Sequence, residues 1–509
     1  AAAAELAEHS LAAARGGGDP QLAWESALEA AREAQAALGH AEAAERYWHA
    51  LEALELGAEA PVDERLAVVL ALAESTFAAG EIELARKRAA RAAAAAQRAG
   101  AAETMARAAL VFAQVQAYGA LDEEAIELLS SALEALGDEP GELRARVTGL
   151  LAARLHPAAD QLRREALIAE AVEMARALGD DRTLLWLQTF SVMIHWRRET
   201  GAIRRDAAEE VVRLAGPVAD HASLLFAHVQ QMRDALEEGD VVAAGAALDR
   251  ARPFARASRR SYQRWYLLVV EAAWATFTGR LGEGERLAAE ALALNRTHGE
   301  DCEQEHTVQQ LVLARLRWRP QDADVTLLRG YASRYAVLPV WEAMLALAES
   351  DLGRHDAAVR GLEACAREDF GLVRASQDVI AALALLGEVG ARSHRHVERL
   401  YELLEPYARL NPVVDHAVAA WGPVARVLGL LAAADDRPDA AAAHFAEALS
   451  LCDAWGAPAW ALRVIGDWLW TAVPGDRAAL LERGLALART LELPWVAASL
   501  GDAAQITTP

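Results

Sequence analysis

Residues 428–448 read LGLLAAADDRPDAAAAHFAEA and hold the clearest copy of a repeated pattern. A small, a bulky and a small residue follow one another at helical spacing, as Ala441, Phe445 and Ala448. On a helix these positions share one face, so the small residues let a neighbouring helix approach and the bulky one fills the groove. Pro438 suits the first position of this helix, where its missing N–H costs nothing. The stretch therefore predicts two helices joined by a tight turn.

The same triplet recurs along the whole chain at a spacing of about 40 residues, which is typical of helix-pair repeats. We therefore predict an all-α, tetratricopeptide-like superhelical solenoid of about twelve helix pairs over residues 1–509, with joints near 137–141 and 406–412. An irregular helical bundle is the alternative, and the constant spacing argues against it. The other copies are Ala43, Tyr47, Ala50; Ala85, Ala89, Ala92; Ala125, Leu129, Ala132; Ala208, Val212, Ala215; Ala244, Leu248, Ala251; Gly284, Ala288, Ala291; Ala358, Leu362, Cys365; and, more weakly, Arg164, Ile168, Ala171 and Val397, Tyr401, Leu404.

The charge balance narrows the classes of function. The chain carries 74 acidic and 51 basic residues, a net charge of −23, so we expect no direct binding of nucleic acid. Lys87 is the only lysine and lies in a stretch without glycine, which excludes a phosphate-binding loop of the Walker type. No apolar run approaches the roughly 20 residues of a membrane span. The widely separated Cys302, Cys365 and Cys452 fit a reducing compartment, and we expect a cytoplasmic protein.

Catalytic motifs are missing from the sequence. It contains neither a Gly-x-Ser-x-Gly elbow nor a His-Glu-x-x-His helix, and we expect no enzyme activity, no cofactor and no metal. Two weak candidates for a metal-binding site are the segment 301–306 and the pair His394 and His396. Their alternative interpretation, which we prefer, is a solvated acidic helix start and an exposed turn between repeats.

One segment inverts the acidic character of the chain. Residues 249–266 read DRARPFARASRRSYQRWY, where arginine forks could bind a carboxylate or phosphate and aromatic rings supply flat apolar contact. The alternative is that the arginines pair with acidic residues of neighbouring repeats while the rings pack in the core. The candidate ligand- or partner-binding residues are Arg259, Arg260, Tyr262, Arg264, Trp265 and Tyr266, together with Trp196 and Arg197 from a smaller cluster.

Tryptophan is frequent for this composition, with 14 residues. First helices line the concave groove of tetratricopeptide superhelices, so rings on them could serve as ligand platforms, although most should belong to the repeat core. The tryptophans that we expect on first helices are Trp24, Trp186, Trp265, Trp274, Trp341, Trp421, Trp460 and Trp468.

Residues 5–54, 262–294 and 403–458 resemble the repeat region of large STAND-type bacterial transcriptional regulators related to the maltose-regulon activator. In that family an ATP-binding module acts as a switch and the repeats act as a sensor surface. The resemblance implies a region type and no ATP-site residue, because the matching phosphate loop is missing here.

We therefore expect the sensor or partner-binding region of a cytoplasmic signal-transducing regulator, which binds a protein, a peptide or a small-molecule effector in its concave groove. The alternative is an assembly scaffold that recruits partners through peptides or helices without sensing a small molecule. We expect no membrane partner, and the full-length protein could form oligomers.

Overall fold

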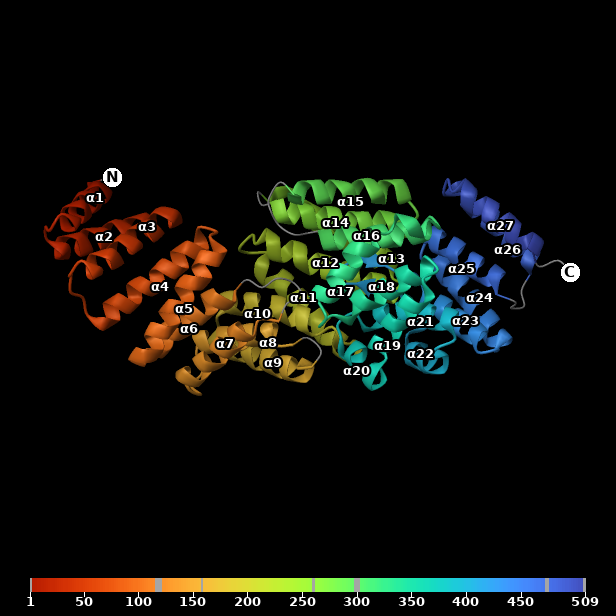
Figure 1. Ribbon diagram of the computed structural model, residues 1–509, viewed down its shortest axis with the longest axis horizontal. Coiled ribbons are helices and arrows are strands. Elements are labelled where there is room, and N and C mark those ends of the chain that lie inside the picture. The colour runs from red at the N-terminus through yellow and green to blue at the C-terminus, as the bar shows by residue number, and fades with distance from the viewer. Residues whose placement is uncertain are drawn as a thin grey trace. The chain divides into compact units, whose positions relative to one another are not determined.

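The computed structural model describes residues 2–114, 121–156, 159–258, 261–296, 303–471 and 476–506. The chain forms two compact units (Figure 1). Unit 1 consists of Ala1–His156 and Asp160–Ile194, and unit 2 of Pro157–Ala159 and His195–Pro509. Of the two joints predicted from the sequence, residues 137–141 connect two helices of unit 1 and residues 406–412 lie inside unit 2, and their role as joints stays a prediction.

Unit 1 is built from helices that follow one another in chain order. Capping side chains set several of their ends; the Asp19 carboxylate, for example, accepts a hydrogen bond from the backbone N–H of Gln21 at 2.9 Å. The helices are α1 (Ala2–Arg15), α2 (Pro20–Ala36), α3 (His40–Glu55), α4 (Val62–Ala78), α5 (Ile82–Ala99), α6 (Ala102–Ala113), α7 (Glu123–Leu136), α8 (Glu142–Arg154), α9 (Gln161–Leu178) and α10 (Asp181–Ile194).

Unit 2 continues the pattern with short 3-10 turns and one hairpin. Its helices are α11 (Gly201–Ala215), α12 (His221–Glu238), α13 (Val241–Ala257), α14 (Ser261–Phe277), α15 (Leu281–Arg296), α16 (Glu303–Leu316), α17 (Val325–Arg334), α18 (Pro339–Asp351), α19 (His355–Cys365), α20 (Arg367–Ala375), α21 (Val379–Ser393), α22 (Val397–Leu404), α23 (Val424–Ala434), α24 (Pro438–Ala454), α25 (Pro458–Trp470), α26 (Arg477–Thr490) and α27 (Pro494–Ile506), and its strands are β1 (Val413–Val414) and β2 (Ala419–Ala420).

The all-α fold of paired helices confirms the prediction from the repeat. Counting α2 with α3 as the first pair and α25 with α26 as the last, and setting α20 aside, the described chain gives twelve pairs in sequence order. The ten predicted triplets all lie on second helices of these pairs, and most of their residues are buried; Ala441, Phe445 and Ala448 have no exposed surface. In α11 the buried bulky residue is Val211 rather than the predicted Val212.

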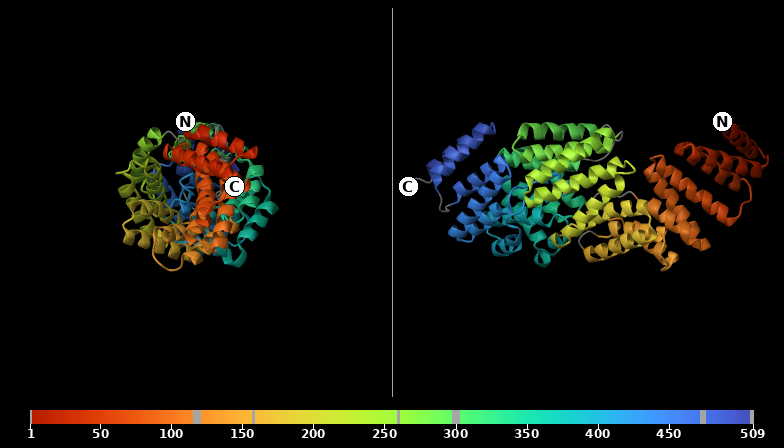
Figure 2. Two further views of the ribbon diagram at one scale, coloured as in Figure 1. Left: turned by 90° about the vertical axis from the view of Figure 1, so that its left-hand side faces the viewer. Right: turned by 180° about the vertical axis from the view of Figure 1, so that it is seen from behind.

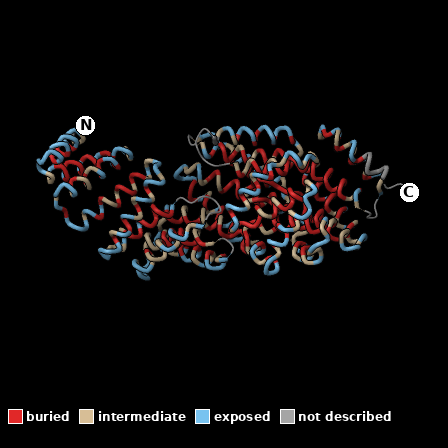
Figure 3. Tube along the Cα trace, in the orientation of Figure 1, coloured by how far each residue is buried: buried red, intermediate tan, exposed pale blue. Residues whose placement is uncertain are grey.

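The buried apolar residues form different patterns in the two units. In unit 1 they fall into separate clusters, one from Ala7 to Leu72 and another from Leu66 to Leu155. In unit 2 one cluster extends from Leu225 to Leu500. Figure 3 shows these buried residues in red on the inward-facing sides of the helices, with exposed residues on the outer turns.

Helices far apart in sequence meet inside unit 2. The indole N–H of Trp495 donates to the backbone carbonyl of Arg317 at 2.6 Å, and the Arg319 guanidinium lies 3.9 Å from the Trp495 ring centroid. The rings of Trp318 and Trp470 are 4.9 Å apart. The blue C-terminal helices accordingly lie beside the green ones, as Figure 2 shows from behind. Unit 2 therefore closes on itself, whereas simple repeat stacking needs contacts only between neighbours.

Candidate functional site

The predicted arginine and aromatic cluster is divided by the fold. Arg259 and Arg260 lie outside the described residues. Tyr262 is 51% exposed, and Arg264 is exposed, at the start of the first helix α14. Trp265 and Tyr266 are buried in the core cluster of unit 2, so their ring faces pack against protein.

The smaller predicted cluster is also divided. Trp196 is buried, with the guanidinium of Arg233 4.8 Å from its ring centroid and the His416 ring 5.2 Å away. Arg197 is only partly exposed. Trp196 is therefore part of the interior of unit 2, and the binding role of this cluster stays a prediction.

The interior of unit 2 contains a short hairpin that the sequence analysis missed. Strands β1 and β2 pair antiparallel, with Val413 opposite Ala420 and Val414 opposite Ala419. Trp421, expected on a first helix, follows β2 instead and is buried, because the first helix α23 begins only at Val424.

The hairpin contacts first helices from four different pairs. Strand β1 packs against α12 and α21, and β2 packs against α14 and α16. A segment this short can touch all four only if these helices face a common interior. Most hairpin residues are buried, including Val413, Val414 and Val418, and only Asp415 and His416 in the turn are partly exposed. Around the hairpin, the first-helix face of unit 2 is thus covered by the chain itself.

Backbone and side-chain hydrogen bonds hold the hairpin in place. The buried Asn411 donates its backbone N–H to Glu237 O at 2.9 Å and its side-chain amide to Leu236 O at 3.1 Å. The side-chain amide of Gln309, on α16, donates to Val418 O at 3.1 Å. Because these groups are buried, losing one partner leaves an unsatisfied polar atom, which typically costs about 1–3 kcal/mol.

A buried carboxyl group lies against the hairpin turn. Asp378 accepts the backbone N–H of Asp415 at 2.9 Å. Burial and the charge of Asp415 raise the pKa of Asp378 to about 7, although the Asp415 N–H and Arg233 act in the opposite direction. At neutral pH this carboxyl group is therefore poised between its neutral and charged forms.

A second buried carboxylate has the opposite environment. Glu388, on α21, pairs with Arg315 of α16 and Arg426 of α23, and all three side chains are almost completely buried. Burial acts to raise the pKa of Glu388, but the two guanidinium groups hold it well below its usual range. Asp351 and Asp467 extend these pairs by accepting from Arg315 and Arg426. We call Arg315, Asp351, Glu388, Arg426 and Asp467 the charge ladder.

An open groove lies at the edge of unit 2 where first helices end and second helices begin. It consists of two cavities of about 550 Å³ and 660 Å³ that share Arg392. The first cavity lies between the end of α18, the start of α19 and the end of α21, and the second between the ends of α21, α23 and α25 and the start of α24. We call these two cavities together the turn-edge groove.

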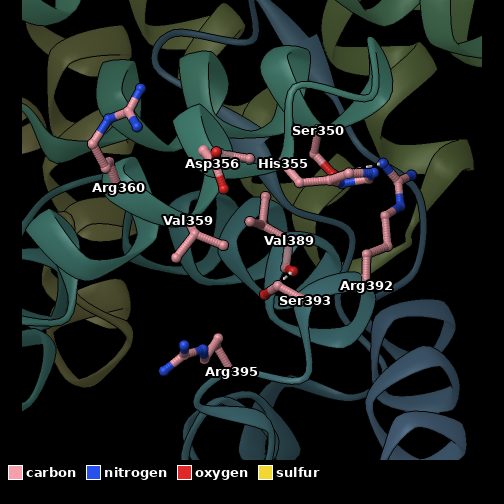
Figure 4. Close-up of a pocket in the computed structure, with 10 residues that line it drawn as sticks. Ser350, His355, Asp356, Val359, Arg360, Val389, Arg392, Ser393 and Arg395 are labelled. Atoms are coloured by element: carbon pink, nitrogen blue, oxygen red, sulfur yellow. Dashed lines mark hydrogen bonds between the residues drawn. The ribbon is translucent and has the colours of Figure 1, made fainter.

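The first cavity has an apolar floor with arginines around it. Figure 4 shows Val359 and Val389 in the middle, with Arg392 on one side and Arg360 and Arg395 on the other. Arg360 and Arg395 are exposed, and neither forms an ion pair within the part of the chain that the structure describes. These exposed guanidinium groups can therefore donate hydrogen bonds to an anionic partner at the rim of the cavity.

Arg392 joins the groove to the charge ladder. Its side chain is 31% exposed and donates to Asp351 at 2.6 Å and to Ser350 Oγ at 3.2 Å, while Glu388 lies 3.6 Å away. Burial acts to lower its pKa, but Asp351 and Glu388 raise it above the ordinary value. Arg392 therefore stays charged and is held in one orientation.

The second cavity combines apolar residues with the polar side chains of Arg392, His394, Asp436 and Thr471. Leu430, Ala433 and Ala434 line it from α23, and Trp470 from the end of α25. Trp470 is 54% exposed although its ring lies 4.9 Å from that of Trp318. An exposed indole over a small-residue surface is the kind of feature that anchors a partner side chain.

The residues considered for metal binding contact different elements. His394 approaches Ala434 O at 3.2 Å, and His396 lies 3.0 Å from the Glu363 carboxylate. Asp301 and Cys302 lie outside the described residues. In the described ranges no three histidine, cysteine, aspartate or glutamate side chains gather in a way that could hold a metal ion.

Sequence reasoning singled out no arginine of the turn-edge groove. Arg360, Arg392 and Arg395 lie far from any aromatic run, and the only feature singled out near them was the pair His394 and His396, which flanks Arg395 and was considered for metal binding. The signal that could have identified them is their position near the helix turns of successive repeats.

No protein-family model matches the chain, and no curated protein matches it. Among solved structures, the chain is similar to the APC/C hetero-tetramer of Cut9 and Hcn1, with 11% identity, a TM-score of 0.47 and coverage of 95% of this chain and 87% of that chain. It is also similar to yeast Tom70, with 12% identity, a TM-score of 0.31 and coverage of 92% and 99%. These structural similarities assign no partner and no activity to the chain. No family model supports the resemblance to STAND-type regulators. Among the described helices, none is both long and apolar enough to cross a membrane.

Proposed function

We propose that the chain is a non-catalytic protein-interaction scaffold that binds a segment of a partner protein in the turn-edge groove of unit 2. Helix-pair solenoids present extended surfaces on which proteins and peptides dock. The observation that carries the proposal is a contrast within unit 2. The first-helix face around the hairpin is filled by Val413–Trp421, whereas the turn-edge groove is open. Exposed arginines and Trp470 line it, together with the two carboxylates of Asp356 and Asp436. The docking site differs from the concave groove expected from the sequence.

Selection of peptides from a random library against the full chain tests this function. Ala433→Tyr should fill the second cavity, because Ala433 lines it and is only partly buried. Ala486→Tyr, on the exposed side of α26, is the matched control. We expect binders that lose affinity with Ala433→Tyr and keep it with Ala486→Tyr. A selection that yields no binder, or only binders indifferent to Ala433→Tyr in a folded variant, would refute the proposal.

A finer form of the function is the sensor region of a cytoplasmic signal-transducing regulator with a small-molecule effector. The size of the two cavities supports this candidate, since small-molecule sites typically measure about 300–1,000 Å³. A thermal-shift screen of the full chain with sugars, nucleotides and metabolites tests it, because a ligand of the folded state raises the melting temperature. If none of these compounds raises the melting temperature, the sensing role is refuted and the scaffold function alone remains.

A further inference from the structure

The turn-edge groove combines two chemistries that a single peptide segment would have to match. One half presents Arg360, Arg392 and Arg395 around the Val359 and Val389 floor, with Asp356 as its one carboxylate, so this half is basic on balance. The other half presents Trp470 and Ala433, with Asp436 also in its lining. The whole chain has a net charge of −23, so this local basic rim is set in an acidic protein. Because the chain as a whole repels an acidic partner, such a partner must be recognised by short-range contacts inside the groove.

We infer that the partner segment is acidic and carries a bulky apolar residue, with its carboxylates at Arg360 and Arg395 and its apolar side chain against Trp470. This inference rests on the proposed function and specifies the chemistry of the partner. Charge complementarity selects the acidic segment, because the two exposed guanidinium groups have no carboxylate partner among the described residues.

The arrangement also explains why the segment needs both features. Exposed ion pairs stabilise a complex by only about 0.2–1 kcal/mol each, so the arginines alone cannot bind a peptide tightly. Trp470 is 54% exposed and adjoins small side chains, so a bulky apolar residue of the partner would cover it. Buried aromatic anchors supply most of the affinity at such interfaces, and charges at the rim supply selectivity.

The groove-dependent peptides from the library selection test this chemistry. We expect them to be enriched in Asp and Glu next to Phe, Trp or Leu. Groove-dependent peptides that are neutral or basic would overturn the inference and leave the proposed function intact. Failure to find any groove-dependent peptide would instead remove the proposed function.

Fluorescence anisotropy with a labelled decapeptide of the enriched type then tests the residues. At about 0.15 M salt long-range repulsion is largely screened, so the measurement reports the local contacts. We expect the double variant Arg360→Gln with Arg395→Gln to weaken binding about tenfold, and Arg489→Gln, an exposed arginine of α26, to leave it unchanged. Replacing each Glu of the peptide by Gln should cost a similar factor, and Trp470→Ala should weaken both peptides.

Two results would contradict the inference. The first is a double variant that folds as the wild type, judged by circular dichroism, and binds the acidic decapeptide equally well. The second is a decapeptide with Lys in place of Glu that binds as tightly as the acidic one.

Discussion

Unit 1 and unit 2 contain the same kind of helix pair but bury different residues between their first helices. Unit 1 has separate alanine-rich clusters, and the ion pairs described in it keep at least one partly exposed side chain, as in Arg107 with Glu74 at 49% and 27% exposure. Unit 2 has one large core cluster and a small second one, a hairpin in its interior and ion pairs with almost no exposed surface. Nearest-neighbour stacking is sufficient for unit 1, whereas unit 2 adds contacts between residues that are 178 and 186 positions apart.

This difference has consequences for stability. In a repeat stack, each pair unfolds with its neighbours, so partial unfolding from an end is expected. Long-range contacts join the pairs of unit 2, so we expect unit 2 to unfold as one cooperative body. Substitutions of buried charge or hairpin packing should therefore affect all of unit 2, while comparable surface substitutions in unit 1 should have small effects.

The largest effect is expected from Glu388→Ala. It leaves Arg315 and Arg426 buried without their shared carboxylate, and breaking a buried pair in this way typically costs about 3–5 kcal/mol. Glu74→Ala in unit 1 removes an exposed pair and should cost about 1 kcal/mol or less. Urea unfolding of both variants measures the difference. Equal losses would show that the charge ladder does not hold unit 2 together.

The next effect depends on pH and concerns Asp378. Its pKa is raised from 3.8 to about 7 in the folded chain, so the group favours folding fully below about pH 4. This stabilisation of the folded state is lost as the pH rises through about 7. Above that pH the group ionises in both states, and the free energy of unfolding no longer changes on its account. Asp378→Asn keeps an oxygen to accept the Asp415 N–H and removes the buried charge, so it should stabilise unit 2 by about 2–4 kcal/mol at pH 8.

Urea unfolding at pH 8 and pH 4.5 tests this prediction, since the gain from Asp378→Asn should shrink toward zero at the lower pH. Asp249→Asn, at an exposed position of α13, serves as the control for general charge effects. A gain that is equal at both pH values would contradict the raised pKa.

A smaller effect is expected where the hairpin meets α25. Gly422 has φ of +75°, and an added Cβ would lie 2.6 Å from the Trp460 ring. Gly422→Ala therefore combines a strained backbone with overpacking and should cost about 2–3 kcal/mol. Gly100 in unit 1 has φ of +69° with open space around it, so Gly100→Ala should cost only about 1 kcal/mol. Equal costs in thermal unfolding would indicate that Trp460 moves aside freely.

The smallest effect is expected at the turn-edge groove itself. Arg360→Gln and Arg395→Gln remove exposed side chains without ion-pair partners in the described chain, and each should change the free energy of unfolding by less than about 0.5 kcal/mol. Urea unfolding checks this result. A loss well above that value would mean that these arginines support the fold.

The repeat predicted the helix pairs because small and bulky residues at fixed spacing report contacts between neighbouring helices. Phe445 and its flanking alanines could be placed from the sequence alone. The hairpin could not, because Val413–Ala420 is too short to show a strand pattern and its partners lie on helices up to 186 positions away. Buried and exposed acidic residues also look alike in sequence: Glu388 and Glu74 both lie on first helices, and only the fold gives them different surroundings.

The central claim is that the hairpin permanently covers the first-helix face of unit 2 and directs partners to the turn-edge groove. Amide hydrogen exchange of the full chain tests it most directly. The N–H groups of Asn411 and Trp421 donate to Glu237 O and Pro412 O, both at 2.9 Å, and the N–H of Gly422 donates to Asn411 Oδ1 at 3.0 Å. We predict that these amides exchange as slowly as those in the middle of α23, which requires unfolding of unit 2. Exchange at the rate of an open loop would show that the hairpin leaves the interior, and would contradict the account.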